Sequence, residues 1–305
     1  MVRELREQDI QCSIAQAASV IGDWWSLLIV REVTRGHRRF DDLLRELGIS
    51  RKVLTERLKH LVDHGVLARE PYQARPVRHE YVLTETGWAL APTLISMQDW
   101  ADRWLLGDGS VTGAPRAGGT EISRVQAVLG TKVPTPLALP TGSPNPAQLN
   151  VVAGSPRPAQ LDVVADANAT ILFAYPSTGP ATSLPPDWDQ VPGTVGCTLE
   201  NRLFRDRHPE LAGAGVAVHG VSTQRPDQQA AFAAAESIPF PLLSDMDLRL
   251  AAALRLPTFR AGQDLKLKRL ILVIDRSRII RHVIFPVLDI PAAITEATDA
   301  ARTLA

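Results

Sequence analysis

The sequence predicts two domains, an α+β domain followed by an α/β domain, and three observations indicate this division. The chain has 305 residues, which is more than one typical core requires. A glycine-rich stretch at 107–119 has the composition of a flexible linker. The apolar residues on each side of it form a pattern of their own. We therefore expect domains at 1–108 and 128–305, joined by a flexible linker at 109–127.

Two helices joined by a short turn are predicted between residues 40 and 64. Gly48 ends the first helix and Ser50 is a favourable N-cap for the second. The first helix has apolar residues at i, i+3, i+4 and i+7, namely Phe40, Leu43, Leu44 and Leu47. The second buries Leu54, Leu58, Leu61 and Val62 and exposes Arg51, Lys52, Thr55, Glu56 and Lys59.

A β wing is predicted next. Strands at 66–69 and 80–83 flank a polar loop that contains Gln73, Arg75, Pro76 and Arg78. The N-terminal domain therefore has the order of a winged helix-turn-helix. The whole chain has no net charge, but residues 31–78 contain twelve Lys or Arg against seven Asp or Glu, which favours a focused DNA-binding surface. Its candidate contacts are Arg38, Arg39, Ser50, Arg51, Lys52, Thr55, Lys59, Arg75 and Arg78.

A long helix at 84–105 is predicted to form a dimer seam. Its apolar residues recur at spacings of three and four, and they are Leu90, Leu94, Met97, Ala101 and Trp104. Pro92 is expected to kink this helix.

The N-terminal domain resembles the HxlR family of bacterial transcription regulators. The resemblance rests on the segment 21–32, on Arg39-Phe40 before the helix-turn-helix, and on the segment 81–87 after the wing. It implies a homodimer that binds a double-stranded DNA operator, with the helix at 50–64 entering the groove and the wing contacting the minor groove or phosphates. HxlR relatives also have a cysteine near the position of Cys12 that can act in thiol sensing.

The second of the two cysteines, Cys197, is placed at a predicted loop-to-helix junction. Free N–H groups and the helix dipole at such a junction favour a thiolate, which is the form that attacks peroxides. Thr194 is close enough in sequence to direct its hydroxyl at the sulfur, and Arg269 opens the apolar strand run 270–275. A hydroxyl and a guanidinium would stabilise the negative charge that develops when a peroxide is cleaved.

The C-terminal domain resembles the peroxiredoxins, most closely the PrxQ group. The matching segments are 129–134, 171–176, 194–200, 204–211 and 238–245, together with Arg269. The resemblance implies an α/β thioredoxin-like (peroxiredoxin-like) domain with a mixed sheet, in which Cys197, Thr194, Arg269 and Pro176 are catalytic. Two features depart from the family. Pro176 lies 21 residues before Cys197, so the loop at 177–193 contains an insertion, and Arg202 occupies the position of the local resolving cysteine.

The two domains together predict a redox-sensing DNA-binding transcription regulator. A hydroperoxide would oxidise Cys197 to a sulfenic acid and alter DNA binding by the winged-helix dimer. Cys12, a second Cys197 or an external thiol would then resolve the sulfenic acid. A Cys12–Cys197 disulfide requires Cα atoms within about 7 Å. No metal or cofactor is expected. The charged N-terminus and the lack of a long apolar segment predict a cytoplasmic protein without a membrane partner.

Two other functions remain open. The chain could be a thiol peroxidase that uses a thioredoxin-like or low-molecular-weight thiol reductant, with the winged helix as a dimer scaffold. It could also be a regulator that senses a small ligand through a redox-inactive thioredoxin-like domain.

Overall fold

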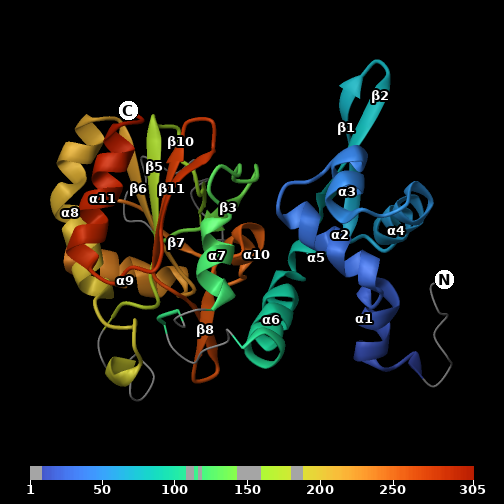
Figure 1. The fold of residues 1–305 in the computed structure, drawn as a ribbon, viewed down its shortest axis with the longest axis horizontal. Coiled ribbons are helices and arrows are strands. Elements are labelled where there is room, and N and C mark those ends of the chain that lie inside the picture. Colours follow the sequence, from blue (N-terminus) through green and yellow to red (C-terminus); the bar gives the residue numbers. More distant parts are fainter. Residues whose placement is uncertain (1–8, 108–112, 116–118, 143–158, 180–187) are drawn as a thin grey trace. The chain divides into compact units, whose positions relative to one another are not determined.

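The computed structural model describes residues 9–107, 113–115, 119–142, 159–179 and 188–305 (Figure 1). Its chain divides into two compact units, Met1–Leu94 and Ile95–Ala305. The domain boundaries expected at 108 and 128 stay predictions. Part of the expected linker nevertheless has regular structure, because helix α7 (Thr120–Gln126) buries Glu121 and Val125. The glycine-rich composition that predicted the linker ends at Gly119.

The first unit contains a helix-turn-helix followed by a β-hairpin. Its core is formed by fully buried residues of α2, α3 and α4, among them Ile29, Leu43 and Leu58. The elements are α1 (Ser13–Ile21), α2 (Trp24–Thr34), α3 (Phe40–Leu47), α4 (Arg51–Asp63), β1 (Leu67–Ala74), β2 (Val77–Leu83) and α5 (Glu85–Trp88). The predicted winged helix-turn-helix architecture is confirmed.

Local sequence explains where these helices begin and end. Gly48 adopts a left-handed conformation with φ of 60° and ends α3. The Ser50 hydroxyl then accepts a hydrogen bond from the Val53 N–H at 3.3 Å and begins α4. Asp23 caps α2 by accepting from the N–H groups of Trp25 and Ser26, each at 3.1 Å. The predicted boundaries of the helix-turn-helix are therefore confirmed.

Two details differ from the sequence prediction. The wing strands are longer than expected, so Gln73 lies in β1 and Arg78 in β2, and only Arg75 and Pro76 separate the strands. The long helix predicted at 84–105 is instead broken between α5 and α6 (Ala91–Ala101). Pro92 lies in the first turn of α6, where a missing N–H costs no helical hydrogen bond, so it begins a helix rather than kinking one.

The second unit is built on a mixed five-stranded sheet with the order β11-β10-β5-β6-β7. Strands β5, β6 and β7 are parallel, and β10 runs antiparallel to both β5 and β11. The strands are β5 (Ala169–Ala174), β6 (Val216–Ser222), β7 (Leu242–Ser244), β10 (Leu270–Asp275) and β11 (Ile280–Ile284). This is the thioredoxin-like α/β fold predicted for the C-terminal part.

Helices and short hairpins surround this sheet (Figure 1). The α-helices after the sheet's first strand are α8 (Cys197–Gly213), α9 (Pro226–Glu236), α10 (Arg249–Leu254) and α11 (Ile290–Arg302). A π-helix, η2 (Asp102–Leu106), follows α6, and a 3-10 turn, η5 (Trp188–Gln190), precedes α8. The two-stranded pairs are β3 (Ala138–Pro140) with β4 (Gln160–Asp162) and β8 (Thr258–Ala261) with β9 (Asp264–Leu267).

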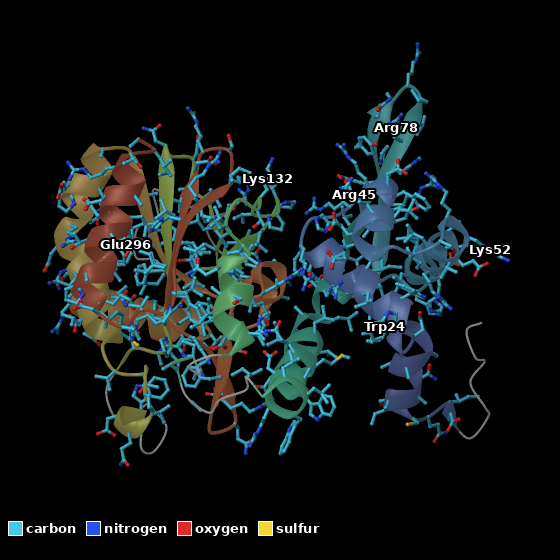
Figure 2. The ribbon with its side chains drawn as sticks, viewed as in Figure 1. Trp24, Arg45, Lys52, Arg78, Lys132 and Glu296 are labelled. Carbon is cyan, nitrogen blue, oxygen red and sulfur yellow. The ribbon has the colours of Figure 1, made fainter. Side chains whose placement is uncertain are left out.

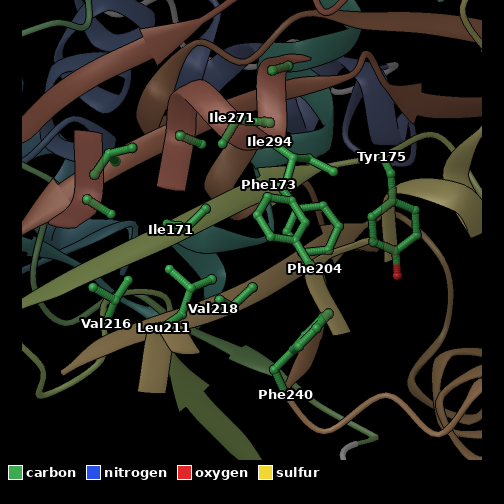
Figure 3. Packing of buried hydrophobic residues seen from close by; sticks show 14 of the residues in the cluster. Ile171, Phe173, Tyr175, Phe204, Leu211, Val216, Val218, Phe240, Ile271 and Ile294 are labelled. Atoms are coloured by element: carbon green, nitrogen blue, oxygen red, sulfur yellow. The ribbon is translucent and has the colours of Figure 1, made fainter. Parts of the chain in front are cut away.

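An aromatic cluster fills the core beside β5 (Figure 3). The Phe173 ring stacks on Phe204 of α8 with centroids 4.5 Å apart, and it meets Phe240 edge-on at 5.8 Å. All six residues of β5 are buried, as expected of a central strand covered on both faces. This packing fixes the first turns of α8 against the end of β5, where the candidate site lies.

Among the described residues, no single helix has both the length and the apolar composition needed to cross a membrane. Only α1 and α2 taken together reach that composition, and they are bent by 75°.

Glu32, near the C-terminal end of α2, forms ion pairs with neighbouring basic side chains. The buried Glu32 carboxylate contacts Arg35 at 2.7 Å, Arg31 at 2.6 Å and the His37 Nδ1 at 2.8 Å. Burial disfavours its ionisation, but His37 and the two arginines outweigh burial and lower the pKa of Glu32 from 4.5 to about 2. The hydrogen bond to Glu32 raises the pKa of His37, with smaller contributions from Glu46 and Asp42.

We predict that Glu32→Gln lowers the free energy of unfolding near neutral pH by roughly 3 kcal/mol. The wild-type advantage is present above pH 4.5 and is lost as the pH falls toward about 2, because the Glu32 pKa is depressed. The part contributed by His37 is complete below pH 6.5 and declines as the pH rises through its elevated pKa. Urea unfolding at a series of pH values measures this difference. Glu56→Gln, on the exposed face of α4, is the control, and an equal stability of E32Q and wild type at neutral pH would contradict the prediction.

Candidate functional site

Cys197 is the first residue of α8, as predicted, and it follows a glycine with unusual backbone geometry. Gly196 has φ of 103°. A Cβ atom built on Gly196 would lie 2.5 Å from the Ile290 Cδ1, which is the end of a flexible side chain, so it is the left-handed backbone that favours glycine here. The Cys197 side chain is only 4% exposed and belongs to the main core cluster of this unit.

Arg269 contacts the sulfur directly. Its Nη2 donates to the Cys197 Sγ at 3.3 Å and to the Val195 carbonyl at 3.1 Å. Its Nη1 pairs with the Glu200 Oε2. Arg269 is 4% exposed and ends the short connection between β9 and β10. The structure therefore brings together Cys197 and Arg269, which are distant in the sequence.

Thr194 contacts the site through its carbonyl rather than through its hydroxyl. The Cys197 thiol donates to the Thr194 carbonyl at 3.3 Å. The Thr194 hydroxyl donates to the carbonyls of Trp188 and Val191, at 2.5 Å and 2.6 Å. The expectation that this hydroxyl points at the sulfur is therefore wrong, because the loop before α8 uses it to hold its own backbone.

Glu200 completes the site, although the sequence reasoning did not single it out. It is fully buried, and its Oε1 has no hydrogen-bond partner among the described residues. Burial raises the pKa of Glu200 to about 7, while Arg269 acts in the opposite direction. The available signal was its spacing, since a residue three positions after Cys197 lies on the same face of α8.

Burial raises the pKa of the Cys197 thiol above its ordinary value, and the Glu200 charge adds to that rise. The Arg269 charge and the Ser177 backbone N–H lower it, but they do not outweigh burial. We expected a thiolate stabilised by the start of α8. That expectation is corrected, because the Cys197 side chain itself is buried and burial outweighs the groups that favour the thiolate.

The segment after β5 forms another wall of the site. Pro176 and Ser177 are both buried, and the Ser177 N–H is the group that faces the Cys197 sulfur. A catalytic role for Pro176 stays a prediction. Residues 180–187 of the predicted loop insertion at 177–193 lie outside the described residues.

Arg202 occupies the position of the resolving cysteine and forms an ion pair, whereas Cys12 lies in the first unit. Arg202 pairs with Glu236 through two hydrogen bonds, at 2.6 Å and 2.9 Å, so this position links α8 to α9. Cys12 is exposed at the N-cap of α1 in the first unit, and its role as a redox partner of Cys197 stays a prediction. Across the described residues, no group of three or more His, Cys, Asp or Glu could hold a metal ion.

The candidate DNA-binding side chains are placed on α4, on the wing and beside α3. The predicted burial of Leu54, Leu58 and Leu61 in α4 is confirmed. Lys52 lies on α4 and Arg78 on the wing (Figure 2). The exposed candidates are Arg39, Ser50, Arg51, Lys52, Thr55, Lys59, Arg75 and Arg78, while Arg38 is half-buried.

Several of these side chains are oriented by neighbours. The Arg39 guanidinium lies over the Tyr72 ring, 4.3 Å from its centroid. Arg51 lies 3.2 Å from the Asp41 carboxylate and faces the Phe40 ring. These contacts orient the guanidinium groups of Arg39 and Arg51.

Comparisons with known proteins match both parts of the chain. Residues 20–108 match the HxlR-like helix-turn-helix family, and residues 190–283 match the AhpC/TSA family. A protein of Mycobacterium tuberculosis, described as an uncharacterized HTH-type transcriptional regulator, is 44% identical over 93 residues, which are 30% of this chain and 59% of that relative. The HTH-type transcriptional regulator YodB of Bacillus subtilis is 37% identical over 89 residues, 29% of this chain and 80% of YodB.

Among solved structures, peroxidoxin BcpB from Mycobacterium tuberculosis matches with 27% identity and a TM-score of 0.44, over 58% of this chain and 97% of BcpB. The chain thus spans less than two thirds of the mycobacterial regulator but most of YodB. The chain belongs to the HxlR-like helix-turn-helix family of transcription regulators and carries in its C-terminal part an AhpC/TSA-type, peroxiredoxin-like domain.

Proposed function

We propose that this protein is a cytoplasmic, homodimeric transcription regulator in which a hydroperoxide oxidises Cys197 and thereby changes DNA binding. One observation carries the proposal: the Arg269 Nη2 lies 3.3 Å from the Cys197 sulfur in a chain that also contains a helix-turn-helix domain. The guanidinium can stabilise both the thiolate and the oxygen that leaves the peroxide. The double-stranded DNA operator is bound by α4 and the wing.

The oxidation step uses groups that surround Cys197. The thiolate sulfur attacks one oxygen of the hydroperoxide, a sulfur–oxygen bond forms and the oxygen–oxygen bond breaks. The sulfur is oxidised by two electrons, and because the attacked oxygen keeps the proton of the hydroperoxide, the product is a sulfenic acid. The proton that the thiol released on ionisation is available to the other oxygen. The other oxygen leaves as hydroxide or alkoxide, takes a proton and departs as water or alcohol. Because Arg202 occupies the nearby position on α8, the sulfenic acid is reduced by Cys12, by a second subunit or by an external thiol.

The homodimer is supported by an apolar surface at the end of α6 and on η2. Large apolar side chains rarely gather on the surface of a monomer, yet this segment exposes several of them. They are Met97, Trp100, Trp104, Leu105 and Leu106, with exposed fractions of 47%, 56%, 65%, 68% and 58%. A second copy of the chain would cover them.

We predict that Cys197→Ser abolishes the effect of peroxide on DNA affinity, because serine does not form a sulfenic acid. Gel-shift titrations on the upstream DNA of the gene, with reduced and peroxide-treated protein, measure this effect. Cys12→Ser is the matched variant at the other cysteine, and its response shows whether Cys12 acts in resolution. A peroxide response that persists in C197S would refute the proposal.

We predict opposite effects of two substitutions on Cys197 reactivity. Arg269→Met removes the positive charge that lowers the Cys197 pKa and should slow oxidation, whereas Glu200→Gln removes a charge that raises this pKa and should accelerate it. In the wild type the oxidation rate should rise as the pH approaches the elevated thiol pKa. Stopped-flow oxidation rates across pH test all three statements. Equal rates for both variants and the wild type would show that Arg269 and Glu200 do not control the sulfur.

We predict that Arg78→Gln weakens DNA binding and reduces the slope of log affinity against log salt by about one, as expected for the loss of one phosphate contact. Arg45→Gln is the control, because Arg45 is 66% exposed on α3 but already pairs with Asp42. Binding measured at several salt concentrations gives the slopes. An unchanged slope for R78Q would remove the wing tip from the DNA interface.

A further inference from the structure

A buried ion pair lies next to Arg269, outside the thiol site. The Lys268 Nζ contacts the Glu121 Oε2 of α7 at 2.8 Å and the Ala114 carbonyl at 3.3 Å. The Lys268 side chain is 0% exposed and that of Glu121 is 5% exposed. An ion pair this deeply buried is costly to break, because the remaining partner is left charged without water.

A second ion pair links α7 to the π-helix η2. Arg124, also on α7, lies 4.0 Å from the Glu121 carboxylate. It forms two hydrogen bonds with Asp102, the first residue of η2, at 2.7 Å and 2.8 Å. The Asp102 and Arg124 side chains are only 12% and 18% exposed. Charges of alternating sign thus run from Lys268 through α7 to η2.

Lys268 and Arg269 are consecutive residues between β9 and β10. Successive side chains of an extended segment point to opposite faces, which agrees with their contacts: Arg269 meets Cys197 and Glu200, whereas Lys268 meets Glu121. The Lys268 N–H also donates to the Pro257 carbonyl at 2.9 Å. Lys268 and Arg269 share one peptide unit, so a backbone shift at Arg269 also moves Lys268.

Asp102, the last residue in this series of ion pairs, lies in η2, which is part of the segment proposed to form the dimer. η2 directly follows α6, and α6 begins at Ala91, within the first unit. The exposed Trp100 and Trp104 flank Asp102 in the sequence. A change in how η2 is held can thus reach the winged helix through one continuous stretch of chain.

We propose that the ion pairs Lys268–Glu121 and Arg124–Asp102 transmit the oxidation state of Cys197 to α6 and η2. This inference rests on the proposed function. The oxygen added to the sulfur needs space inside a closed site, so it displaces the Arg269 guanidinium. The displacement separates Lys268 from Glu121. The Glu121 carboxylate, then left with the more distant Arg124 at 4.0 Å, favours release of α7, and η2 loses the Arg124 contact that fixes it.

Hydrogen–deuterium exchange on the full chain tests this route without any substitution. Peptides covering α7 and η2 are compared before and after stoichiometric hydrogen peroxide, with Cys197 oxidation verified by mass spectrometry. We expect exchange in both segments to rise by about tenfold in the wild type and to stay constant in C197S. Unchanged exchange in α7 with Cys197 fully oxidised would overturn the inference.

Lys268→Met tests the same route in DNA binding. The variant should bind DNA in the reduced state as the oxidised wild type does, and it should no longer respond to peroxide. Glu121→Gln should act in the same direction. Lys266→Met is the matched control, since Lys266 lies two residues earlier on β9 and pairs with Asp264 at 3.1 Å, and it should respond as the wild type does.

The outcomes separate this inference from the proposed function. If peroxide leaves the DNA affinity of the wild type unchanged while hydrogen–deuterium exchange in α7 rises, the proposed function fails and the structural link stands. If the wild type responds but K268M and E121Q respond by the same factor, the link fails and the proposed function stands.

Discussion

The structure depends on one guanidinium in a closed pocket. Arg269 holds the Cys197 sulfur, the Glu200 carboxylate and the Val195 carbonyl at once. The sulfur and the carboxylate are both buried, so Arg269 is the cation that offsets their negative charge when they ionise. The pocket keeps Cys197 mainly as a thiol, because burial outweighs the opposing effects of Arg269 and Ser177. A sulfur held in this way reacts only as far as its surroundings admit peroxide and stabilise the charge that develops.

The connection between β9 and β10 also underlies the link that we propose between the thiol site and the DNA-binding domain. The connection between β9 and β10 places consecutive residues in two different buried ion networks. One network surrounds the reactive sulfur, and the other ties α7 to the segment after α6. Buried ion pairs of this kind are sensitive to small displacements, because their geometry must be good to offset the loss of solvation.

Sequence alone predicted both domain folds because the relevant patterns are local. Periodic apolar residues, Gly48 and Ser50 determine the helix-turn-helix, and the apolar runs at 171–175 and 270–275 predict two strands. Cys197 and Arg269 were found through a family resemblance, and the structure places them in contact. The thiol pKa was predicted in the wrong direction, because a helix start favours a thiolate only where burial does not dominate. The Thr194 hydroxyl bonds to backbone carbonyls of its own loop, which the sequence pattern does not reveal. The linkage through Lys268 depends on tertiary contacts that no local pattern encodes. The break before Pro92 was within reach of sequence reasoning, since proline is favourable in a first helical turn.

We propose that DNA binding responds to the oxidation of Cys197. A single peroxide titration of the full-length protein tests it, with sulfenic acid at Cys197 quantified by dimedone trapping and mass spectrometry and DNA affinity measured on the same samples. The account predicts that the two curves coincide and that affinity changes by about tenfold when Cys197 is fully oxidised. A constant affinity across complete oxidation of Cys197 would contradict it.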